Sequence, residues 1–235
     1  MMLKIKNCFQ GLLKSSGIGR AIYPFCKKCW RAYAIPQRRR RLQKSGPAAL
    51  GRLHGLMVEN GVPYYCDYGT LIGLMREGGF LKHDDDIDIS VQPDAVEPKK
   101  LLQIFLKAGY GFVHGFEYEG RLTEFTITDI SGIFIDVFFP TRLDDDKING
   151  YQTIWESGKV YPSEYANTII QYDFIAAKDI KAINVLGVEA NVPGNFDDVL
   201  TSEYGPWRVP DAKFDTVKDR IHRELPGFST RFVSI

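Results

Sequence analysis

Residues 69–91 read GTLIGLMREGGFLKHDDDIDISV and place an apolar helical stretch, a glycine-rich turn, a cluster of acidic residues and a strand in direct succession. The helical stretch begins at Gly69-Thr70 and ends at Gly78-Gly79, because glycine favours the end of a helix. The acidic residues are Asp84, Asp85, Asp86 and Asp88. They run directly into an apolar pattern that predicts a buried strand at residues 87–91. Buried carboxylates are rare unless they are paired or bind a metal, so their position here indicates a function.

The period of a strand divides these aspartates. Side chains alternate between two faces, so Asp86 and Asp88 share one face with Ser90. Carboxylates two residues apart are separated by about 7 Å at the backbone, and their side chains can converge on one divalent cation. A third carboxylate is predicted at Asp136, which interrupts the apolar strand pattern GIFIDVFFP at residues 132–140. The alternatives for Asp136 are an ion pair with a buried arginine and the cap of a loop.

The acidic runs also allow two other interpretations, a calcium-binding loop and a solvated turn. A calcium-binding loop that starts at Asp84 would need glycine at its sixth position and glutamate at its twelfth, where this chain has Ile89 and Ala95. That interpretation fails. The later run at residues 144–146 precedes Asn149-Gly150, a hairpin-turn signal, and predicts a solvated turn.

A phosphate-binding position is predicted ahead of the aspartates. Gly69-Thr70 stands where a predicted strand at residues 62–68 passes into a helix, and the free N–H groups of a helix start favour an anion. Arg76 and Lys82 lie between this position and the aspartates and can neutralise phosphate oxygens. The alternatives are an ordinary helix start and two solvated basic side chains.

The charge of the chain is unevenly distributed. The 235 residues carry 30 basic and 29 acidic side chains, but residues 1–45 hold 12 of the basic ones and none of the acidic ones. We therefore predict two parts, a basic, aromatic-rich tail at residues 1–45 and an acidic domain at residues 46–235, with a hinge in KSGPAAL at residues 44–50. Aromatic and basic residues together favour attachment of the tail to an anionic membrane face, with a solvated tail as the alternative. Nucleic-acid binding is not expected, because the domain is acidic and no nucleic-acid-binding module is recognisable.

The remaining patterns predict a mixed architecture. We expect helices at residues 50–60, at residues 98–109 behind a capping-box pattern of Asp94 and Glu97, and at residues 195–205. Strands are expected at residues 121–128 and 132–140, with a strand pair at residues 183–193. This mixture predicts an α/β or α+β domain. No apolar run is long enough to cross a membrane, four unevenly spaced cysteines do not indicate a disulfide framework, and Cys26 and Cys29 lack a second ligand pair for zinc.

Residues 69–91 closely resemble the signature of the LicD/fukutin family, which belongs to the nucleotidyltransferase-fold superfamily. The resemblance extends from about Leu50 through FIDVFF to LTSEYGPWRVP, which ends at Pro210. It implies a nucleotidyltransferase-like mixed β-sheet flanked by helices. The basic N-terminal tail ahead of this domain is expected to be helical. The chain departs from the family at His83, where relatives often carry tryptophan.

The resemblance also implies a function. Relatives are transferases that use a CDP-activated alcohol and move phosphocholine or a polyol phosphate onto cell-surface glycans. The expected cofactor is Mg²⁺ or Mn²⁺. The expected metal ligands are Asp84, Asp86, Asp88 and Asp136, of which the last three are also the expected catalytic residues. The expected substrate-binding residues are Gly69, Thr70, Arg76, Lys82 and His83.

Three activities are compatible with these residues. The first is transfer of a phospho-alcohol unit from a CDP-activated donor to a free or lipid-linked glycan, by an enzyme at the inner face of a cell membrane. The second is a nucleotidyltransferase that passes a nucleoside monophosphate to a small acceptor. The third is a glycan-binding relative without turnover, which the complete carboxylate set disfavours because a binding module has no need of that repulsion.

Overall fold

The computed structural model describes residues 17–154, 166–227 and 229–232, with side chains from residue 32 onward except at 166 and 167. The elements in chain order are α2 (Gly17–Glu59), β1 (Tyr64–Cys66), α3 (Tyr68–Glu77), β2 (Asp86–Val91), α4 (Pro98–Lys107), β3 (Gly111–Tyr118), β4 (Arg121–Thr128), β5 (Phe134–Phe138), β6 (Thr141–Arg142), β7 (Lys147–Ile154), β8 (Ala166–Ile175), β9 (Lys181–Val185), β10 (Val188–Val192), α5 (Phe196–Tyr204), β11 (His222–Glu224) and β12 (Ser229–Phe232). The prediction of a mixed α/β architecture is confirmed.

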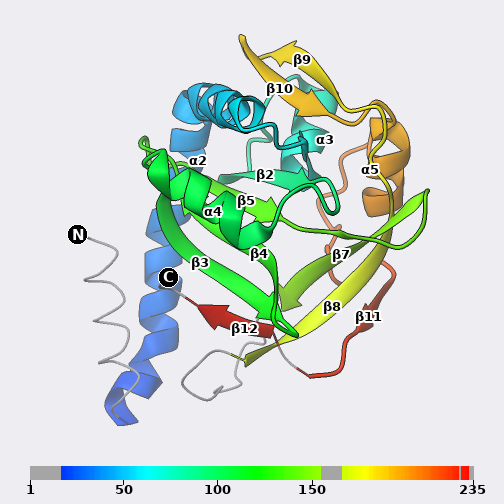
Figure 1. Cartoon of the computed structure of the whole chain (residues 1–235). Coiled ribbons are helices and arrows are strands. Elements are labelled where there is room, and N and C mark those ends of the chain that lie inside the picture. The colour runs from blue at the N-terminus through cyan, green and yellow to red at the C-terminus, as the bar shows by residue number, and fades with distance from the viewer. Residues whose placement is uncertain (1–16, 155–165, 228, 233–235) are drawn as a thin grey trace.

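One large sheet organises these elements (Figure 1). Its strand order is β1-β2-β5-β4-β3-β12-β8-β7-β6, and β11 adds to β8. Strands β2 and β5 run parallel, whereas the other pairs among the described strands are antiparallel. Strand β12 pairs with both β3 and β8 and so joins the two halves of the sheet. Strands β9 and β10 form a separate hairpin, as the sequence predicts.

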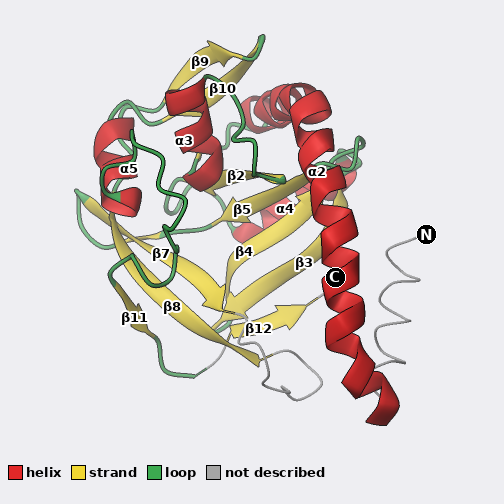
Figure 2. Cartoon of the chain, turned by 180° about the vertical axis from the view of Figure 1, so that it is seen from behind, coloured by secondary structure: helices red, strands yellow, loops and turns green. Residues whose placement is uncertain are grey.

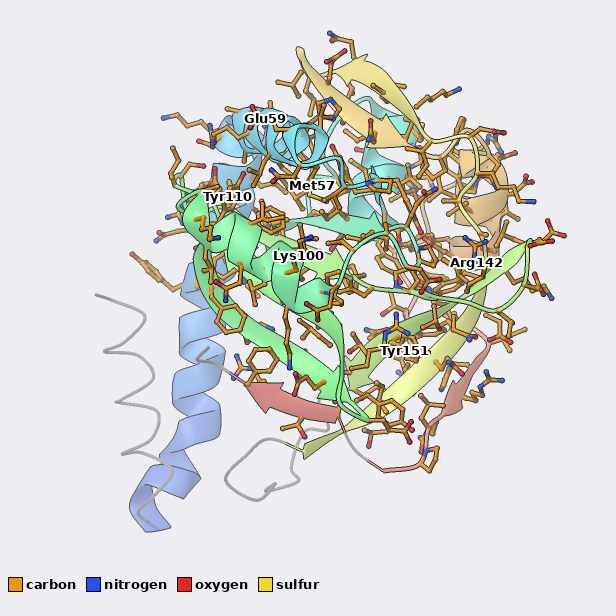
Figure 3. All side chains as sticks on the ribbon, in the orientation of Figure 1. Met57, Glu59, Lys100, Tyr110, Arg142 and Tyr151 are labelled. Atoms are coloured by element: carbon orange, nitrogen blue, oxygen red, sulfur yellow. The ribbon has the colours of Figure 1, made fainter. Side chains whose placement is uncertain are left out.

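The core forms on one face of β2, β5 and β4, because the strand period alternates apolar and polar side chains. Ile87, Ile135 and Phe125 are fully buried there and belong to one cluster with residues of α2 and α4. Met57 and Tyr110, both labelled in Figure 3, are members of the same cluster. Figure 1 shows α4 in front of the sheet, and Figure 2 shows α3 and α5 nearer the viewer from behind. The polar side chains of the same strands face the side of α3 and α5.

Helix α2 differs most from the sequence-based expectation. The predicted hinge at residues 44–50 is wrong, because the helix continues from Gly17 to Glu59 through this segment. Figure 1 shows the helix changing direction between its blue first part and its light-blue second part. Gly46-Pro47 lies in this stretch, and proline bends a helix without ending it where packing supports the freed carbonyl. Leu42 is already fully buried ahead of the bend. The division of the chain at residues 45 and 46 stays a prediction.

Helix α3 has the predicted limits and well-defined ends. Asp67 precedes it as N-cap, and its carboxylate accepts a hydrogen bond from the Tyr68 N–H at 3.0 Å. Gly78 ends the helix with a φ of +67°, a conformation that favours glycine. Gly73 allows the turn after the helix to approach closely, since a Cβ there would lie 2.6 Å from the Gly79 carbonyl oxygen. This close contact fixes the path of the chain into β2.

Other local predictions need correction. Asn149-Gly150 is not a turn but lies inside β7, where Asn149 pairs with Asp173 and Gly150 with Tyr172. The turn lies at residues 144–146, which are exposed as predicted. The cap of α4 is Glu97 itself, whose carboxylate accepts from the Lys100 N–H at 2.7 Å, so the capping box with Asp94 is wrong.

Strands β3, β6, β7, β8, β11 and β12 were not predicted. Strand β3 pairs with its neighbour β4 and with the distant β12, and β8 pairs with β7, β11 and β12. In the part of the chain that the structure describes, no helix is both long enough and apolar enough to cross a membrane.

Candidate active site

Four polar side chains form one row across the sheet. The register pairs Asp88 of β2 with Asp136 of β5, Asp136 with Thr126 of β4, and Thr126 with His114 of β3. Residues that pair in register lie on the same face, and neighbouring strands are about 4.8 Å apart. Asp86 lies on the same face one strand period before Asp88. The structure therefore brings together the three carboxylates that the sequence predicted.

Burial and mutual repulsion disfavour the charged forms of these carboxylates. Burial, and then the negative charge of Asp136, raise the pKa of Asp86 well above its usual range. Burial and the charge of Asp86 do the same to the pKa of Asp88. The pKa of Asp136 is also raised by burial, although a hydrogen bond from Thr126 and the charge of Arg38 oppose this. The site thus concentrates more negative charge than the protein side chains around it neutralise.

Asp84 and Gly69 lie together at the entrance of this face. A Cβ on Gly69 would lie 2.8 Å from Asp84 Oδ2, so the absence of a side chain at Gly69 permits this approach. The Oδ2 atom of Asp84 is buried without a hydrogen-bond partner in the described part of the chain. Burial raises the pKa of Asp84 to about 6. The structure therefore adds Asp84 to the carboxylate cluster.

Thr70 stabilises the strand that carries Asp88. Its side chain is fully buried, and its Oγ1 accepts a hydrogen bond from the Asp88 N–H at 2.8 Å. The structure does not bring the Thr70 hydroxyl to the pocket surface. Thr70 instead fixes the backbone of the strand that carries Asp88.

Arg76, Lys82 and His83, which the sequence predicted as substrate contacts, line the same pocket but differ in their surroundings. Arg76 Nη1 donates to the Trp207 carbonyl oxygen at 2.9 Å, which ties α3 to the segment after α5. Lys82 is exposed. His83 is also exposed, and its Nε2 lies 3.9 Å from Asp84 Oδ1. The direct substrate contacts predicted for these side chains stay predictions.

Arg38 reaches the acidic residues from helix α2. Its Nε lies 2.9 Å from Asp85 Oδ2 and its Nη2 lies 3.9 Å from Asp86 Oδ2. Its guanidinium carbon lies 3.7 Å from the centre of the Phe134 ring. The sequence placed Arg38 in a basic tail and gave no signal for this contact, because the long helix brings it to the sheet from a distant part of the chain.

A fifth carboxylate, Glu124, was also missed. It lies on β4 opposite Phe138, two residues before Thr126 and on the same face. Burial, followed by the charge of Asp136, raises the pKa of Glu124 to about 8. The alternation of residues 121–128 indicates that Glu124 and Thr126 share a face, but only the pairing of β4 with β5 shows that this face is the one with Asp136.

The raised carboxylate pKa values predict a specific pH dependence of stability. A carboxyl group with a raised folded-state pKa binds protons more readily in the folded protein, so stability falls as pH rises toward that pKa. His114 has its pKa lowered to about 3 by burial and acts in the opposite direction, but only below its unfolded value of about 6.5. Between pH 6.5 and 8 the carboxyl effect remains, with a slope of at most about 1.4 kcal/mol per pH unit from Glu124.

We therefore expect the melting temperature of the chelator-treated protein to fall from pH 6.5 to 8. Glu124→Gln is expected to reduce this slope, because it removes the group whose pKa lies at about 8. Differential scanning calorimetry of both proteins measures the effect. A melting temperature that rises over this interval would contradict the assigned pKa shifts.

A second buried charge cluster supports the wall next to the carboxylates. Asp67 accepts from Ser90 Oγ at 2.5 Å, and burial raises the pKa values of both Asp67 and Glu203. Arg220 Nε donates to the Glu203 carbonyl oxygen at 2.9 Å. The Arg220 guanidinium carbon lies 4.7–6.0 Å from the centres of five rings, those of Tyr68, Tyr172, Phe174, Tyr204 and Phe214. No local sequence pattern predicts this cluster, because its members become neighbours only in the folded chain.

The carboxylates and the residues around them line one large pocket of about 2060 Å³ that is open to solvent. The carboxylates form its acidic floor, and several basic residues surround them, namely Arg38, Arg41, Arg76, Lys82, Lys213, Arg220 and Arg231. Carboxylates surrounded by basic side chains suit a cation that also binds phosphate groups, because the carboxylates can bind the cation and the basic side chains can bind phosphate oxygens. The pocket is large enough for a nucleotide together with part of a second substrate.

The donor atoms at the floor fit a hard divalent cation. They are carboxylate oxygens alone, which Mg²⁺ and Mn²⁺ prefer, and the unpartnered Asp84 Oδ2 provides a further one. Among the described residues, no three His, Cys, Asp or Glu side chains converge into a ready-made metal site.

Sequence comparisons agree with the residues of this site. The model of the family described as LicD/FKTN/FKRP, nucleotidyltransferase domain, matches residues 61–195, which is more than half of the chain. The match includes every predicted site residue. It also confirms the nucleotidyltransferase-like fold class predicted from the sequence.

Curated relatives match over shorter parts of their own length. Ribitol-5-phosphate transferase FKTN of Mus musculus is 26% identical over 157 residues, which are 66% of this chain and 31% of that protein. An uncharacterized protein of Rickettsia typhi is 34% identical over 62 residues, which are 26% of this chain and 20% of that protein. The aligned regions thus span less than a third of each curated relative.

Among solved structures, the chain is similar to the lincosamide antibiotic adenylyltransferase LnuA in its lincomycin-bound crystal structure. The sequence identity is 17% and the TM-score is 0.39, with 63% of this chain and 80% of that chain covered.

Proposed function

Because the chain belongs to the LicD/FKTN/FKRP family through its nucleotidyltransferase domain, we propose that it is a metal-dependent transferase for a phospho-alcohol unit. The donor in this proposal is a CDP-activated alcohol, such as a choline or polyol derivative, and the acceptor is a hydroxyl group of a cell-surface glycan. The observation that carries the proposal is the pairing of Asp88 with Asp136 beside Asp86, inside one large pocket. The relative named for ribitol-5-phosphate transfer supports the class of the transferred group.

In this proposal Asp86, Asp88 and Asp136, with Asp84, hold Mg²⁺ or Mn²⁺. The bound cation supplies charge neutralisation to the diphosphate of the donor and to the departing CMP. Gly69 lies at the start of α3 beside Asp84, so in this proposal a phosphate reaches the helix start through the cation that Asp84 helps to hold. The acidic floor is otherwise repulsive to a diphosphate, so donor binding is expected to depend on the cation.

Asp136 is the group that we assign as general base. Its Oδ1 accepts a hydrogen bond from Thr126 at 2.6 Å, which leaves Oδ2 for a proton from the acceptor hydroxyl. The hydroxyl oxygen then forms the new bond to phosphorus as the bond between phosphorus and the CMP oxygen breaks. Protonation of Asp136 thus balances the charge of the alkoxide that attacks.

The proposal is tested by product analysis with defined donors. Purified protein, Mg²⁺ and a glycan acceptor are incubated with CDP-choline, CDP-ribitol or CDP-glycerol, and the expected products are CMP and a phosphorylated glycan. The matched reaction contains nucleoside triphosphates in place of the CDP-alcohols. Pyrophosphate release in that reaction, without CMP release from any CDP-alcohol, would instead support a nucleotidyltransferase.

A thermal-shift screen identifies the donor independently of turnover. A ligand that binds only the folded protein increases its free energy of unfolding, by about 2.7 kcal/mol at a ligand concentration of a hundred times the Kd. The melting temperature rises accordingly. The true CDP-alcohol is expected to give the largest shift, and only with Mg²⁺ or Mn²⁺ present. Stabilisation by a glycan alone, without any response to a nucleotide or a cation, would indicate a binding protein without turnover.

A further inference from the structure

We propose that Thr126 and His114 are positioning residues that act through a hydrogen-bond chain to hold the carboxylate of Asp136. The inference rests on the proposed function, because it assigns a task to residues next to the general base. Neither residue belongs to the sequence motif that identified the site. The chain runs along the row of four paired residues that crosses β2, β5, β4 and β3.

A β-bulge places His114 in this row. The register of β3 and β4 shifts between Phe112 and His114, so Phe112 pairs with Ile127 and His114 pairs with Thr126. Without the shift, Val113 would be the partner of Thr126. Bulges of this kind re-aim a side chain and are common beside active sites. The irregular step in β3 thus brings an imidazole, and not an aliphatic side chain, next to Thr126.

The distances define a chain of two hydrogen bonds. Thr126 Oγ1 donates to Asp136 Oδ1 at 2.6 Å, and His114 Nε2 lies 3.2 Å from the same Thr126 oxygen. A threonine hydroxyl has a single hydrogen, and here it points to the carboxylate. The Thr126 oxygen can therefore only accept from His114, which requires a hydrogen on Nε2.

The other imidazole nitrogen agrees with this tautomer. His114 Nδ1 is buried without a hydrogen-bond partner in the described part of the structure. A buried N–H group without a partner is more unfavourable than a bare ring nitrogen, so the hydrogen belongs on Nε2. Burial, and then the nearby Arg231 and Arg38, lower the pKa of His114 to about 3, which keeps the ring neutral.

The two hydrogen bonds therefore run from His114 to Thr126 and from Thr126 to Asp136, and they hold one of the two carboxylate oxygens of Asp136 in place. The chain Nε2–H to Oγ1–H to Oδ1 holds the carboxylate plane, and Oδ2 remains available to the pocket. A base that is itself oriented by a third group is a common arrangement in active sites. Hydrogen-bond partners of metal-binding carboxylates likewise raise metal affinity and activity, typically by 10- to 100-fold.

Kinetic variants test the inference. Thr126→Val removes the hydroxyl but keeps the shape, and we expect it to lower kcat by roughly 10- to 100-fold with little change in the KM of the donor. Thr126→Ser restores the hydroxyl and is expected to recover most of this loss. Thr128→Val is the matched control, because Thr128 lies two residues further along the same strand face and does not line the pocket, and its hydroxyl donates to the Gly111 carbonyl oxygen at 3.4 Å. It is expected to keep normal kcat.

A double-variant cycle separates a positioning role from general damage. His114→Ala alone is expected to lower kcat by roughly 10-fold, and His114→Ala combined with Thr126→Val is expected to be no worse than Thr126→Val alone. This follows because His114 acts only through the Thr126 hydroxyl. Additive losses in the double variant would overturn the chain, as would a Thr126→Val enzyme that is as active as Thr128→Val.

Two measurements test the chain without any transfer assay. Imidazole ¹⁵N NMR of the full chain should show His114 as the Nε2–H tautomer, and Thr126→Val should remove this preference. Mn²⁺ titration by calorimetry should show a Kd weakened roughly 10-fold in Thr126→Val and unchanged in Thr128→Val.

These results also separate the inference from the proposed function. If no CDP-alcohol is a substrate but the tautomer is as stated, the proposed function fails and the hydrogen-bond chain stands. If transfer occurs but His114 carries its hydrogen on Nδ1, the chain fails and the proposed function stands.

Discussion

Replacement of Asp88 or Asp136 by asparagine is expected to lower kcat by about 100- to 1000-fold, the loss seen when a group that stabilises a transition state directly is removed. The two residues pair in register on parallel strands, so their carboxylates are neighbours on one face of the sheet, and both line the pocket. Asparagine keeps the shape of the side chain but provides neither the negative charge for a cation nor, at position 136, a base for the acceptor hydroxyl.

The same substitutions should stabilise the chelator-treated protein. Burial and the charges of neighbouring carboxylates raise the pKa values of both residues, which means that their charged forms oppose folding at neutral pH. Removal of one charge relieves this opposition, so the melting temperature should rise while activity is lost. Loss of activity with gain of stability is characteristic of a functional site and not of a structural ion pair.

Asp145→Asn is the matched control for this experiment. Asp145 is exposed in the turn before β7 and does not line the pocket, so its replacement should change neither quantity. Near-normal transfer by Asp136→Asn would refute the assignment of the base. A fall in melting temperature for both Asp88→Asn and Asp136→Asn would show that these carboxylates stabilise the fold.

Replacement of Arg220 by alanine is expected to give the largest loss of stability, about 3–5 kcal/mol, or roughly 10 °C in melting temperature. The guanidinium group is buried among five aromatic rings and is the cation beside the buried Asp67 and Glu203. Its removal leaves these carboxyl groups without a positive charge and opens space between the rings. Urea and thermal unfolding measure the loss.

Arg223→Ala provides the comparison. Arg223 lies three residues later, contacts Gln171 and Asp173, and has an exposed side chain. Exposed pairs of this kind contribute about 0–1 kcal/mol, so the variant should unfold close to the wild type. Equal losses for Arg220→Ala and Arg223→Ala would show that the aromatic enclosure of Arg220 has no special effect on stability.

The sequence predicted what depends on local pattern. The period of residues 86–91 placed Asp86 and Asp88 on one face, and the interruption of an apolar strand identified Asp136. Helix α3 and the β9–β10 hairpin follow from short-range signals of the same kind. Each of these features is decided by residues within about ten positions of one another.

What the sequence did not predict depends on contacts between distant segments. The parallel register of β2 with β5, the bulge that aims His114 at Thr126, and the reach of Arg38 from α2 arise only when the sheet is assembled. The Asn149-Gly150 signal was misleading for the same reason. Gly150 is needed inside β7 because a Cβ there would lie 2.9 Å from the Phe174 ring, and this packing requirement has no local signature.

The position of β12 has a consequence for the order in which the molecule is built during synthesis. Residues 229–232 bridge β3 and β8, yet they leave the ribosome after every other strand described. The nascent chain can therefore form β1 to β5, and separately β6 to β8, but these two pieces of sheet have no strand between them until the final bridge emerges. The exposed edges of β3 and β8 are open to wrong partners in this interval, as unpaired edges are in general. The late arrival of four residues thus determines when the nascent protein stops being prone to edge-to-edge association.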